Sequence, residues 1–356
     1  MLELKVHGQG IFTFTTPSKC TINILSKIND NGVSFHFGET VNVNLLPSNE
    51  PLPDPSNNKK LLPLENVYYW ISIDSQNKKI YAGIGEPRPE TVIYRYTLSK
   101  QFLEAMTHIQ YSESVKPKCL LKDPIPYNVP MLVKKNMTLT SIGKGDHLPH
   151  SHLSPIGQRL YNCISGDTFV LNEPDFRNFG KTIEKSIRTP GYWCYDKLKS
   201  KQNEFGDDPN MSYLRITMGQ NNGESPGMEY VMEIWPPGHY SPVHSHAGAN
   251  AIIKVLRGKI NVKLYSFLNE IIEPFKTATF EKKEITWISP TLNQTHQLHN
   301  KGTKTCVTIQ CYMYPENDSV HYDYFDYLDT SGNEKQYTPD TDCDFMEFKR
   351  ILKNER

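Results

Sequence analysis

Two histidines one residue apart, His244 and His246, stand just before an apolar segment, residues 251–256, which ends near a glycine. Successive side chains in a β-strand point to opposite faces, so both imidazoles would project from the same face of an extended chain. The apolar segment reads as one strand, and residues 259–265, which alternate apolar and polar side chains, read as the next. This stretch predicts antiparallel β structure that carries two imidazoles on one side.

A third histidine, His296, follows another short predicted strand, residues 285–289. A His-x-His pair alone is weak evidence for a metal site, because most such pairs arise from packing or chance. A third imidazole after a neighbouring strand strengthens the interpretation, and we expect His244, His246 and His296 to hold one metal ion. Imidazole suits iron, zinc, copper and nickel about equally, so these ligands do not identify the metal.

The layout of these histidines resembles the cupin family, whose domain is a small antiparallel barrel. The first cupin motif contains a glycine, His-x-His and a closing glycine, and the second contains a proline, a histidine and an asparagine four residues later. The resemblance covers roughly residues 170–335. The matching residues are Gly238, His244, His246, Gly258, Pro290, His296 and Asn300.

The acidic residue that usually completes the first motif would fall near Asn250 or Ala251, and no acid stands there. Three histidines without a carboxylate resemble the thiol dioxygenase branch of cupins, typified by cysteine dioxygenase. Three neutral ligands leave the full positive charge on the metal, which favours binding of a thiolate. The resemblance therefore implies Fe(II) as cofactor, and L-cysteine or a related small thiol and O₂ as substrates of an oxidation that yields a sulfinate.

The segment from Tyr213 to Arg215 resembles the family's Tyr-x-Arg segment, whose arginine binds the carboxylate of the substrate. A planar guanidinium can form two parallel hydrogen bonds with a carboxylate, so arginine suits this role. The alternative is that Arg215 is an ordinary surface charge. A turn-rich insert at residues 221–227, longer than is usual for the family, separates it from the histidine motif.

A later strand resembles the family strand that carries a hydroxyl residue, a histidine and a tyrosine at alternate positions. Thr308, Gln310 and Tyr312 would share one face of it. Gln310 replaces the histidine, so it can hydrogen-bond to Tyr312 but cannot shuttle a proton. A one-residue gap in the alignment leaves Tyr314 as the second candidate for the catalytic tyrosine. Ala251 stands where animal members have a cysteine that cross-links to the tyrosine, so no cross-link is expected.

The predicted fold class is mostly β, with a C-terminal cupin (a small antiparallel β-barrel or jelly roll), a short helical lead-in and an N-terminal β-sandwich-like domain. Short strand patterns separated by turn residues fill residues 1–157, residues 158–210 read as linker and lead-in, and residues 211–356 as the cupin. The N-terminal domain is expected to be structural or to mediate oligomerisation. Binding of a protein or carbohydrate partner is the alternative.

Helical patterns occur in the lead-in and near the C-terminus. Asp175 is expected to cap a helix whose apolar residues recur over residues 176–187, and residues 192–198 and 344–352 predict two more short helices. A second histidine cluster, residues 147–152, is expected to be an interdomain loop and not a metal site, because prolines flank it and no partner follows at a familiar spacing.

Composition excludes several classes of protein. The formal net charge is zero and no long basic run occurs, so neither nucleic acid nor a membrane surface is an expected partner. No stretch has the roughly 20 apolar residues that span a bilayer, and we expect no signal peptide. The seven scattered cysteines form no C-x-x-C pair, which indicates reduced thiols in a cytoplasmic protein.

Three functions are compatible with this sequence. The first is an iron-dependent thiol dioxygenase, with His244, His246 and His296 as ligands. The second is a non-catalytic metal- or ligand-binding cupin attached to an interaction sandwich; the glutamine at position 310 and the large extra domain leave it open. The third is a cupin enzyme with another metal and substrate, such as an isomerase, and the missing acid disfavours it.

Overall fold

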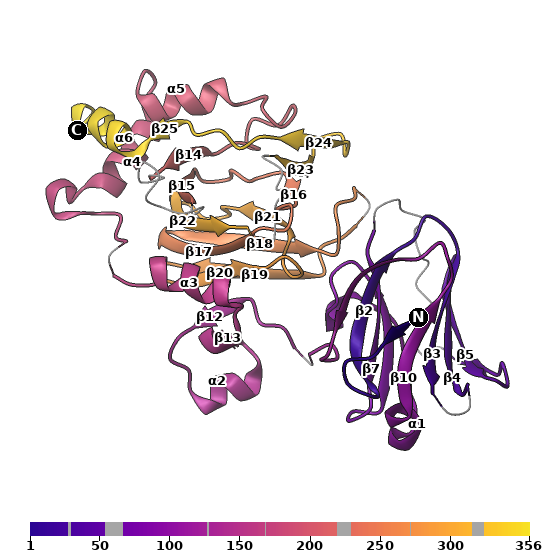
Figure 1. Ribbon diagram of the computed structural model, residues 1–356. Coiled ribbons are helices and arrows are strands. Elements are labelled where there is room, and N and C mark those ends of the chain that lie inside the picture. Colours follow the sequence, from indigo (N-terminus) through magenta and orange to yellow (C-terminus); the bar gives the residue numbers. More distant parts are fainter. Residues whose placement is uncertain are drawn as a thin grey trace. The chain divides into compact units, whose positions relative to one another are not determined.

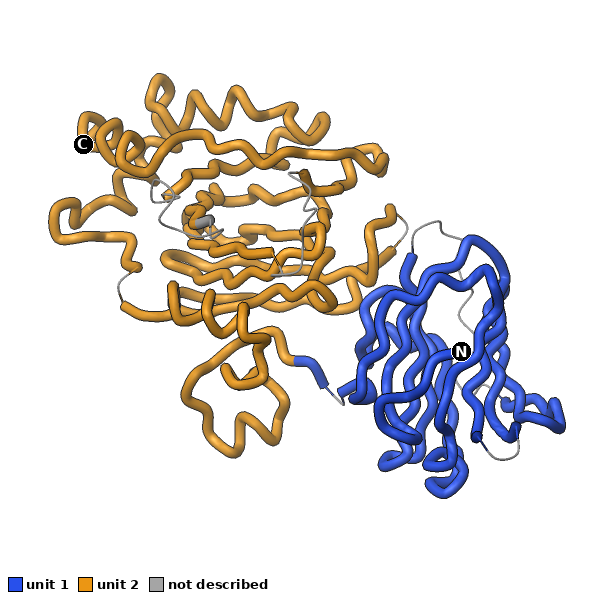
Figure 2. Tube along the Cα trace, in the orientation of Figure 1, with its two compact units in different colours: residues 1–129 blue, residues 130–356 orange. Residues whose placement is uncertain are grey.

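The computed structural model divides the chain into two compact units, residues 1–129 and 130–356 (Figure 2). The predicted turn-rich insert at 221–227 lies outside the described residues. The structure describes residues 1–27, 30–53, 67–126, 128–167, 169–218, 229–270, 272–314 and 324–356.

The first unit consists of two antiparallel sheets (Figure 1). One sheet contains, in spatial order, β1 (Leu2–Glu3), β10 (Met106–Tyr111), β3 (Cys20–Ser26), β4 (Gly32–Phe37), β5 (Val41–Leu46) and β6 (Pro51–Leu52). The other contains β11 (Lys116–Leu121), β2 (Gln9–Thr15), β7 (Tyr69–Asp74), β8 (Lys79–Ile84) and β9 (Val92–Thr97). Two short helices, η1 (Pro89–Thr91) and α1 (Lys100–Glu104), precede β9 and β10.

The two sheets of the first unit enclose one apolar core. Alternate residues of β2, such as Phe12 and Phe14, pack against residues of the other sheet, such as Phe35 and Phe37, and all four are buried. The Phe14 and Phe37 rings meet edge to face, with centroids 5.1 Å apart. This alternation produces the β-sandwich-like unit that the sequence predicts.

The second unit has an eight-stranded and a six-stranded sheet, most of whose strand pairs are antiparallel. The first contains β13 (His147–Pro149), β12 (Leu132–Lys134), β20 (Ile285–Ile288), β17 (Asn250–Arg257), β22 (Cys306–Met313), β15 (Glu229–Trp235), β14 (Leu214–Thr217) and β25 (Cys343–Asp344). The second contains β19 (Lys276–Glu281), β18 (Lys259–Tyr265), β21 (Thr295–His299), β16 (Val243–His244), β23 (Phe325–Leu328) and β24 (Glu334–Tyr337).

Side chains from both sheets of the second unit form a shared core. Trp235 and Val255 come from the larger sheet, whereas Val262 and Leu298 come from the smaller one. The chain passes from β17 to β18 at Gly258, whose positive φ of 71° is easily adopted by glycine. Together with the first unit, this arrangement confirms the predicted fold class, mostly β with a sandwich-like unit and a second, two-sheet β domain.

The helices of the second unit include the predicted lead-in and the C-terminal helix (Figure 1). The predicted cap at Asp175 is wrong: α4 starts after Asn178, and Asp175 pairs instead with Lys349 and Lys353 of α6, at 2.9 and 3.1 Å. The helices are α2 (Leu139–Lys144), η2 (His150–His152), α3 (Pro155–Ile164), η3 (Pro174–Phe176), α4 (Phe179–Arg188), α5 (Trp193–Ser200) and α6 (Phe345–Asn354).

The boundary between the units lies nearer the N-terminus than residue 157, where the sequence places it. β12 pairs with β20, through Leu132 and Thr286, and β13 pairs with β12. These pairings attach residues 132–149 to the second unit, and the histidine cluster at 147–152 forms β13 and η2 there. Within the described ranges, no helix is long and apolar enough to cross a membrane.

We expect Gly83→Ala to destabilise the first unit. Gly83 lies opposite Trp70 in the β7–β8 pairing, and a Cβ at this position would lie 2.1 Å from the fully buried Trp70 ring. Overpacking of this kind costs about 1–3 kcal/mol. Gly143→Ala is the matched control, because a Cβ there meets nothing within 4 Å. Denaturant unfolding followed by circular dichroism would contradict this packing if both variants had the stability of the parent.

Candidate metal centre

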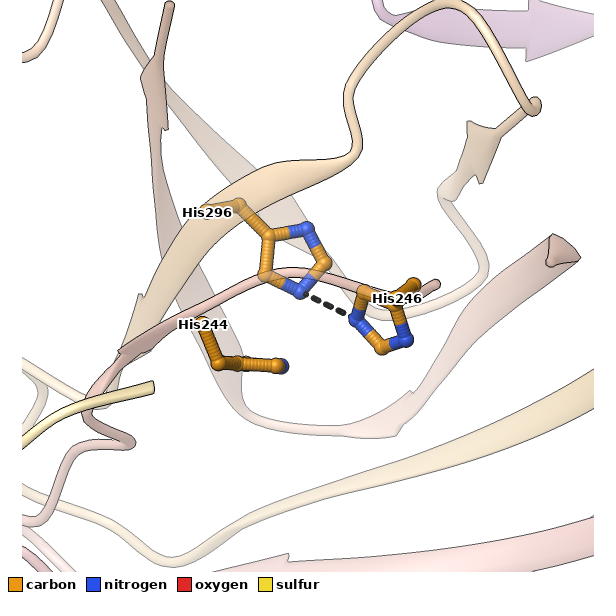
Figure 3. Close-up of side chains that lie close together, drawn as sticks. All are labelled: His244, His246 and His296. Atoms are coloured by element: carbon orange, nitrogen blue, oxygen red, sulfur yellow. Dashed lines mark hydrogen bonds between the residues drawn. The ribbon is translucent and has the colours of Figure 1, made fainter. Parts of the chain in front are cut away.

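The three predicted histidines converge on one point of the second unit (Figure 3). β16 pairs with β21 so that His244 is directly opposite His296. His246 lies two residues beyond, outside β16, where Ala247 and Gly248 both have positive φ. One potential ligand atom from each ring lies within 4.8 Å of the others, and the described residues contain no other such group of three.

The spacing of the rings suits ligands of a single ion. The Nε2 atoms of His246 and His296 are 3.0 Å apart. Two ligand atoms about 2.1 Å from one ion and at a right angle to each other would be separated by about 3.0 Å. Both side chains are almost completely buried, and the Nδ1 atom of His246 has no hydrogen-bond partner among the described residues. The three residues present therefore fit a bound metal ion.

The protonation state of the rings also suits metal binding. Burial lowers the pKa of His244 to about 4, although a hydrogen bond to Pro242 partly opposes this effect. In that bond the Nδ1–H of His244 donates to the Pro242 carbonyl at 3.0 Å, which leaves Nε2 with its lone pair. Burial, followed by the neighbouring histidines, lowers the pKa of His246 and His296 well below the usual value. Neutral imidazole is the form that binds metals.

A small cavity lies beside the histidines, and it brings together residues from distant parts of the second unit. Its polar lining includes the predicted Arg215, Tyr213, Gln310 and Tyr312. Its remaining lining residues are Glu233, Trp235, His244, His246, His296, Leu298, Phe325 and Pro339. A ligand in this cavity would reach the imidazoles, a guanidinium and a phenol at once.

Of the two candidate tyrosines, Tyr312 is the one that lines the cavity. Its ring stacks beside His246, with centroids 5.7 Å apart, and its hydroxyl donates to the Oε1 atom of Gln310. Tyr314 lies beyond the end of β22 and is not among the described lining residues. Ala251 is the cross-strand partner of Tyr312, so a methyl group lies opposite this tyrosine.

The third residue of this strand face, Thr308, lies deeper in the sheet. Its hydroxyl accepts a hydrogen bond from the indole of Trp235 at 3.3 Å, and the residue is fully buried. Trp235 in turn stacks on Tyr213, with centroids 4.2 Å apart. Burial raises the pKa of Tyr213 well above its usual value. Thr308 and Tyr213 thus belong to the packed wall around the site.

Arg215 is buried and not an ordinary surface charge, since only 3% of it is exposed. Its guanidinium donates to the carbonyl of Pro339 and lines the cavity. Its backbone N–H donates to the carboxylate of Asp342, and the backbone N–H of Asp342 donates back to the Arg215 carbonyl, both at 2.7 Å. Residues 339–343, here called the C-terminal strap, therefore hold Arg215 in place.

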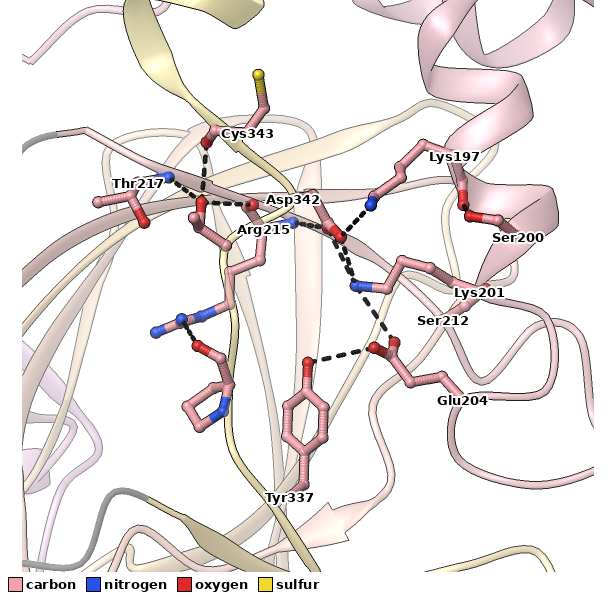
Figure 4. Close-up of polar contacts among 12 residues, drawn as sticks. Lys197, Ser200, Lys201, Glu204, Ser212, Arg215, Thr217, Tyr337, Asp342 and Cys343 are labelled. Carbon is pink, nitrogen blue, oxygen red and sulfur yellow. Dashed lines mark hydrogen bonds and ion pairs between the residues drawn. The ribbon is translucent and has the colours of Figure 1, made fainter.

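Two lysines of the lead-in fix the strap from the other side (Figure 4). Lys201 lies 3.0 Å and Lys197 3.5 Å from carboxylate oxygens of Asp342. Glu204 joins this network through Lys201, at 3.2 Å, and accepts a hydrogen bond from the Tyr337 hydroxyl at 3.4 Å. Sequence reasoning missed the strap, because its partners are more than a hundred residues away along the chain.

Glu233 is the other residue that sequence reasoning missed. It lies on β15, is only 5% exposed, and accepts a hydrogen bond from the Nε2 atom of Gln310. The sequence could have indicated this residue, because Glu233 alternates with Val231 and Trp235 in the strand and so lies on the same face as these two buried side chains. A carboxylate between two buried apolar residues of the same strand face indicates a polar partner or a ligand.

No family model matches the sequence. Solved structures with partial similarity include a cupin domain of an XRE family transcriptional regulator from Enterobacter cloacae. It is 15% identical, and the match covers 29% of this chain and 98% of that chain with a TM-score of 0.24. An oxalate oxidase in complex with the substrate analogue glycolate is 18% identical, and the match covers 30% of this chain and 53% of that chain with a TM-score of 0.25. A putative sugar phosphate isomerase from Acidithiobacillus ferrooxidans is 18% identical, and the match covers 37% of this chain and 79% of that chain with a TM-score of 0.26.

We expect the second unit to bind about one divalent first-row metal ion per chain, and His296→Ala to weaken that binding at least about 100-fold, because it removes one of three ligands. Metal content after desalting, measured by mass spectrometry, tests this expectation. His299→Ala is the matched control: its ring packs on Tyr240 and is not one of the three converging imidazoles. Equal metal content in both variants would exclude His296 as a ligand.

Proposed function

We propose that this protein is a mononuclear iron thiol dioxygenase that converts L-cysteine, or a related small thiol, to its sulfinate. The observation that supports this most strongly is the ligand group itself, three neutral imidazoles, two of them buried and one partly buried, in a cavity that Arg215 and Tyr312 also line. The motif resemblance to cysteine dioxygenases points the same way. In this reaction both atoms of O₂ end on sulfur, and the thiol sulfur supplies all the electrons, so no further reductant is needed.

His244, His246 and His296 would hold iron(II), which would supply a positive charge that favours the thiolate form of a substrate and a redox centre for O₂. The chain's own residues position the substrate. Arg215 offers its guanidinium for the carboxylate, and the C-terminal strap fixes its backbone. The apolar side chains of Trp235, Leu298 and Phe325 also line the cavity, and they limit the space for water beside the sulfur.

Tyr312 is the proposed catalytic tyrosine, acting beside His246 as a hydrogen-bonding group for bound substrate or oxygen. Its hydroxyl proton points to Gln310, an amide that neither gains nor loses a proton near neutral pH. Tyr312 therefore orients its ligand through hydrogen bonding. It has no acid–base relay through Gln310 of the kind that a histidine at that position would provide.

The direct test is oxygen uptake by protein loaded anaerobically with Fe(II) and then given L-cysteine and O₂. We expect one sulfinate for each O₂ consumed, and no uptake by His296→Ala, because that variant lacks a ligand. Iron binding without uptake with any small thiol would contradict the enzyme and favour a barrel that only binds a metal or ligand.

Replacement of the two tyrosines separates their roles. Tyr312→Phe removes the hydroxyl beside His246, and we expect turnover to fall about 10- to 100-fold, as for other groups that hydrogen-bond the reacting centre. Tyr314→Phe is the matched control and should retain near-parent turnover, since Tyr314 does not line the cavity in the described chain. Steady-state sulfinate formation measures both. A larger loss with Tyr314→Phe would reassign the catalytic tyrosine.

A further inference from the structure

The outer face of the larger sheet, turned away from the metal cavity, holds a buried thiol. Cys311 stands between Gln310 and Tyr312 on β22, and successive side chains of a strand point to opposite faces. Because Gln310 and Tyr312 line the cavity, the thiol of Cys311 points to the other side of the sheet. Its cross-strand partners there are Tyr230 on β15 and Ile252 on β17. This face is therefore separate from the site of the three histidines.

Helix α3 packs against this outer face and brings a second thiol to it. The Nζ atom of Lys254, on β17, donates to the Gly166 carbonyl just beyond the helix at 2.6 Å, which fixes the helix end over the sheet. Cα atoms of α3 and β22 approach within 8 Å of each other. Cys163, the last residue but one of α3, is partly exposed, whereas Cys311 is fully buried. A disulfide joins residues whose Cα atoms are about 4–7 Å apart, a separation that this packing brings into reach.

The Tyr230 hydroxyl connects the two cysteines. It hydrogen-bonds with the thiols of both Cys163 and Cys311, which come from distant parts of the chain. The Tyr230 ring is held in place by Phe169, on which it stacks with centroids 5.8 Å apart. Two sulfur atoms within hydrogen-bond reach of one oxygen lie close to each other. A phenol donates a single proton, so the same hydroxyl can stabilise the thiolate of whichever cysteine has ionised.

The two thiols differ in their access to solvent and in their acidity. Burial, followed by the neighbouring Cys163, raises the pKa of Cys311 to about 12, and the Tyr230 hydroxyl opposes this effect only in part. Cys311 is therefore protonated at neutral pH, and a thiolate is the form that attacks a disulfide. Cys163 is the thiol that a dissolved reagent can reach. One accessible thiol beside one buried thiol is typical of cysteine pairs that are oxidised reversibly.

We propose that Cys163 and Cys311 form a reversible disulfide when the protein meets a small-molecule disulfide, which makes this face a thiol-oxidation site apart from the metal centre. The Cys163 thiolate attacks one sulfur of the small disulfide, whose S–S bond breaks and releases a first thiolate. Cys311 then gives up its proton and attacks the Cys163 sulfur of the mixed disulfide, which releases a second thiolate. The two protein thiols are oxidised, the small disulfide is reduced to two thiols, and the two cysteine protons pass to the released thiolates.

The new bond ties α3 to the strand whose inner face presents Gln310 and Tyr312 to the cavity. All seven cysteines are reduced in the structure, so oxidation adds a constraint that the reduced protein lacks. Because the bond links residues far apart in the sequence, it restricts the unfolded chain and should raise the denaturant midpoint of the second unit. The site needs no metal ion and does not depend on the proposed dioxygenase activity.

Peptide mapping of the full-length protein tests this inference. The protein is incubated anaerobically with oxidised glutathione, the remaining thiols are alkylated, and linked peptides are identified by mass spectrometry. We expect one peptide pair joined through Cys163 and Cys311, which dithiothreitol separates. A lasting glutathione adduct on Cys163, or alkylation of both Cys163 and Cys311, would overturn the inference. The parent protein alone decides this, so a folding defect in a variant cannot obscure the result.

Three variants test the order of attack and the role of the hydroxyl. Cys163→Ser should leave Cys311 unreacted with glutathione, because the remaining thiol is buried. Tyr230→Phe keeps the ring on Phe169 but lacks the hydroxyl, and it should slow formation of the link about tenfold, since a thiolate loses a hydrogen bond. Cys119→Ser is the matched control, because Cys119 is a partly exposed thiol of the first unit, and the link should form at the parent rate. A parent rate in Tyr230→Phe would reject the role of the hydroxyl.

Discussion

Three imidazole rings lie close together in the second unit, with His246 and His296 buried and His244 partly buried, and the chemistry of the site depends on their removal from water. A proton on any ring would place a positive charge in a medium of low polarity, with ligand atoms of the other two rings within 4.8 Å. The rings therefore stay neutral, which is the form that can bind a metal ion. The packed wall that keeps water out also positions the arginine, glutamate and tyrosine beside them.

The convergence of these groups depends on strand register. His244 meets His296 because β16 and β21 pair at that one position, and Arg215 meets Glu233 because β14 and β15 pair as they do. A shift of one residue in either pairing would turn the whole set of side chains to the opposite face. The second pairing of β15 helps to fix its register, because β15 also pairs with β22 at seven consecutive positions, from Glu229–Tyr312 to Trp235–Cys306.

Local sequence patterns predict much of this unit. The His-x-His pair, the apolar run before Gly258 and the alternation after it place β17, β18 and two of the ligands, because strand parity is a local property. Parity also places Tyr312 and Gln310 on one face. Features that depend on distant pairing are the ones that sequence reasoning misses. The boundary between the units depends on the pairing of β12 with β20, and the environment of Arg215 depends on its hydrogen bonds with the C-terminal strap. Asp175 has the sequence of a helix cap, yet its carboxylate pairs with two lysines of α6, which lies far along the chain.

The strap has a consequence for how the protein is made. Arg215 and Asp342 are separated by 127 positions, and strand β25, which continues the strap, pairs in parallel with β14. During synthesis β14 leaves the ribosome long before its outer neighbour exists, at the usual pace of several residues per second. The nascent domain thus has an unpaired sheet edge at β14, and the arginine side of its cavity is incomplete until residues 339–344 have emerged. Any metal ion that enters the completed cavity would therefore have to enter after residues 339–344 have been synthesised.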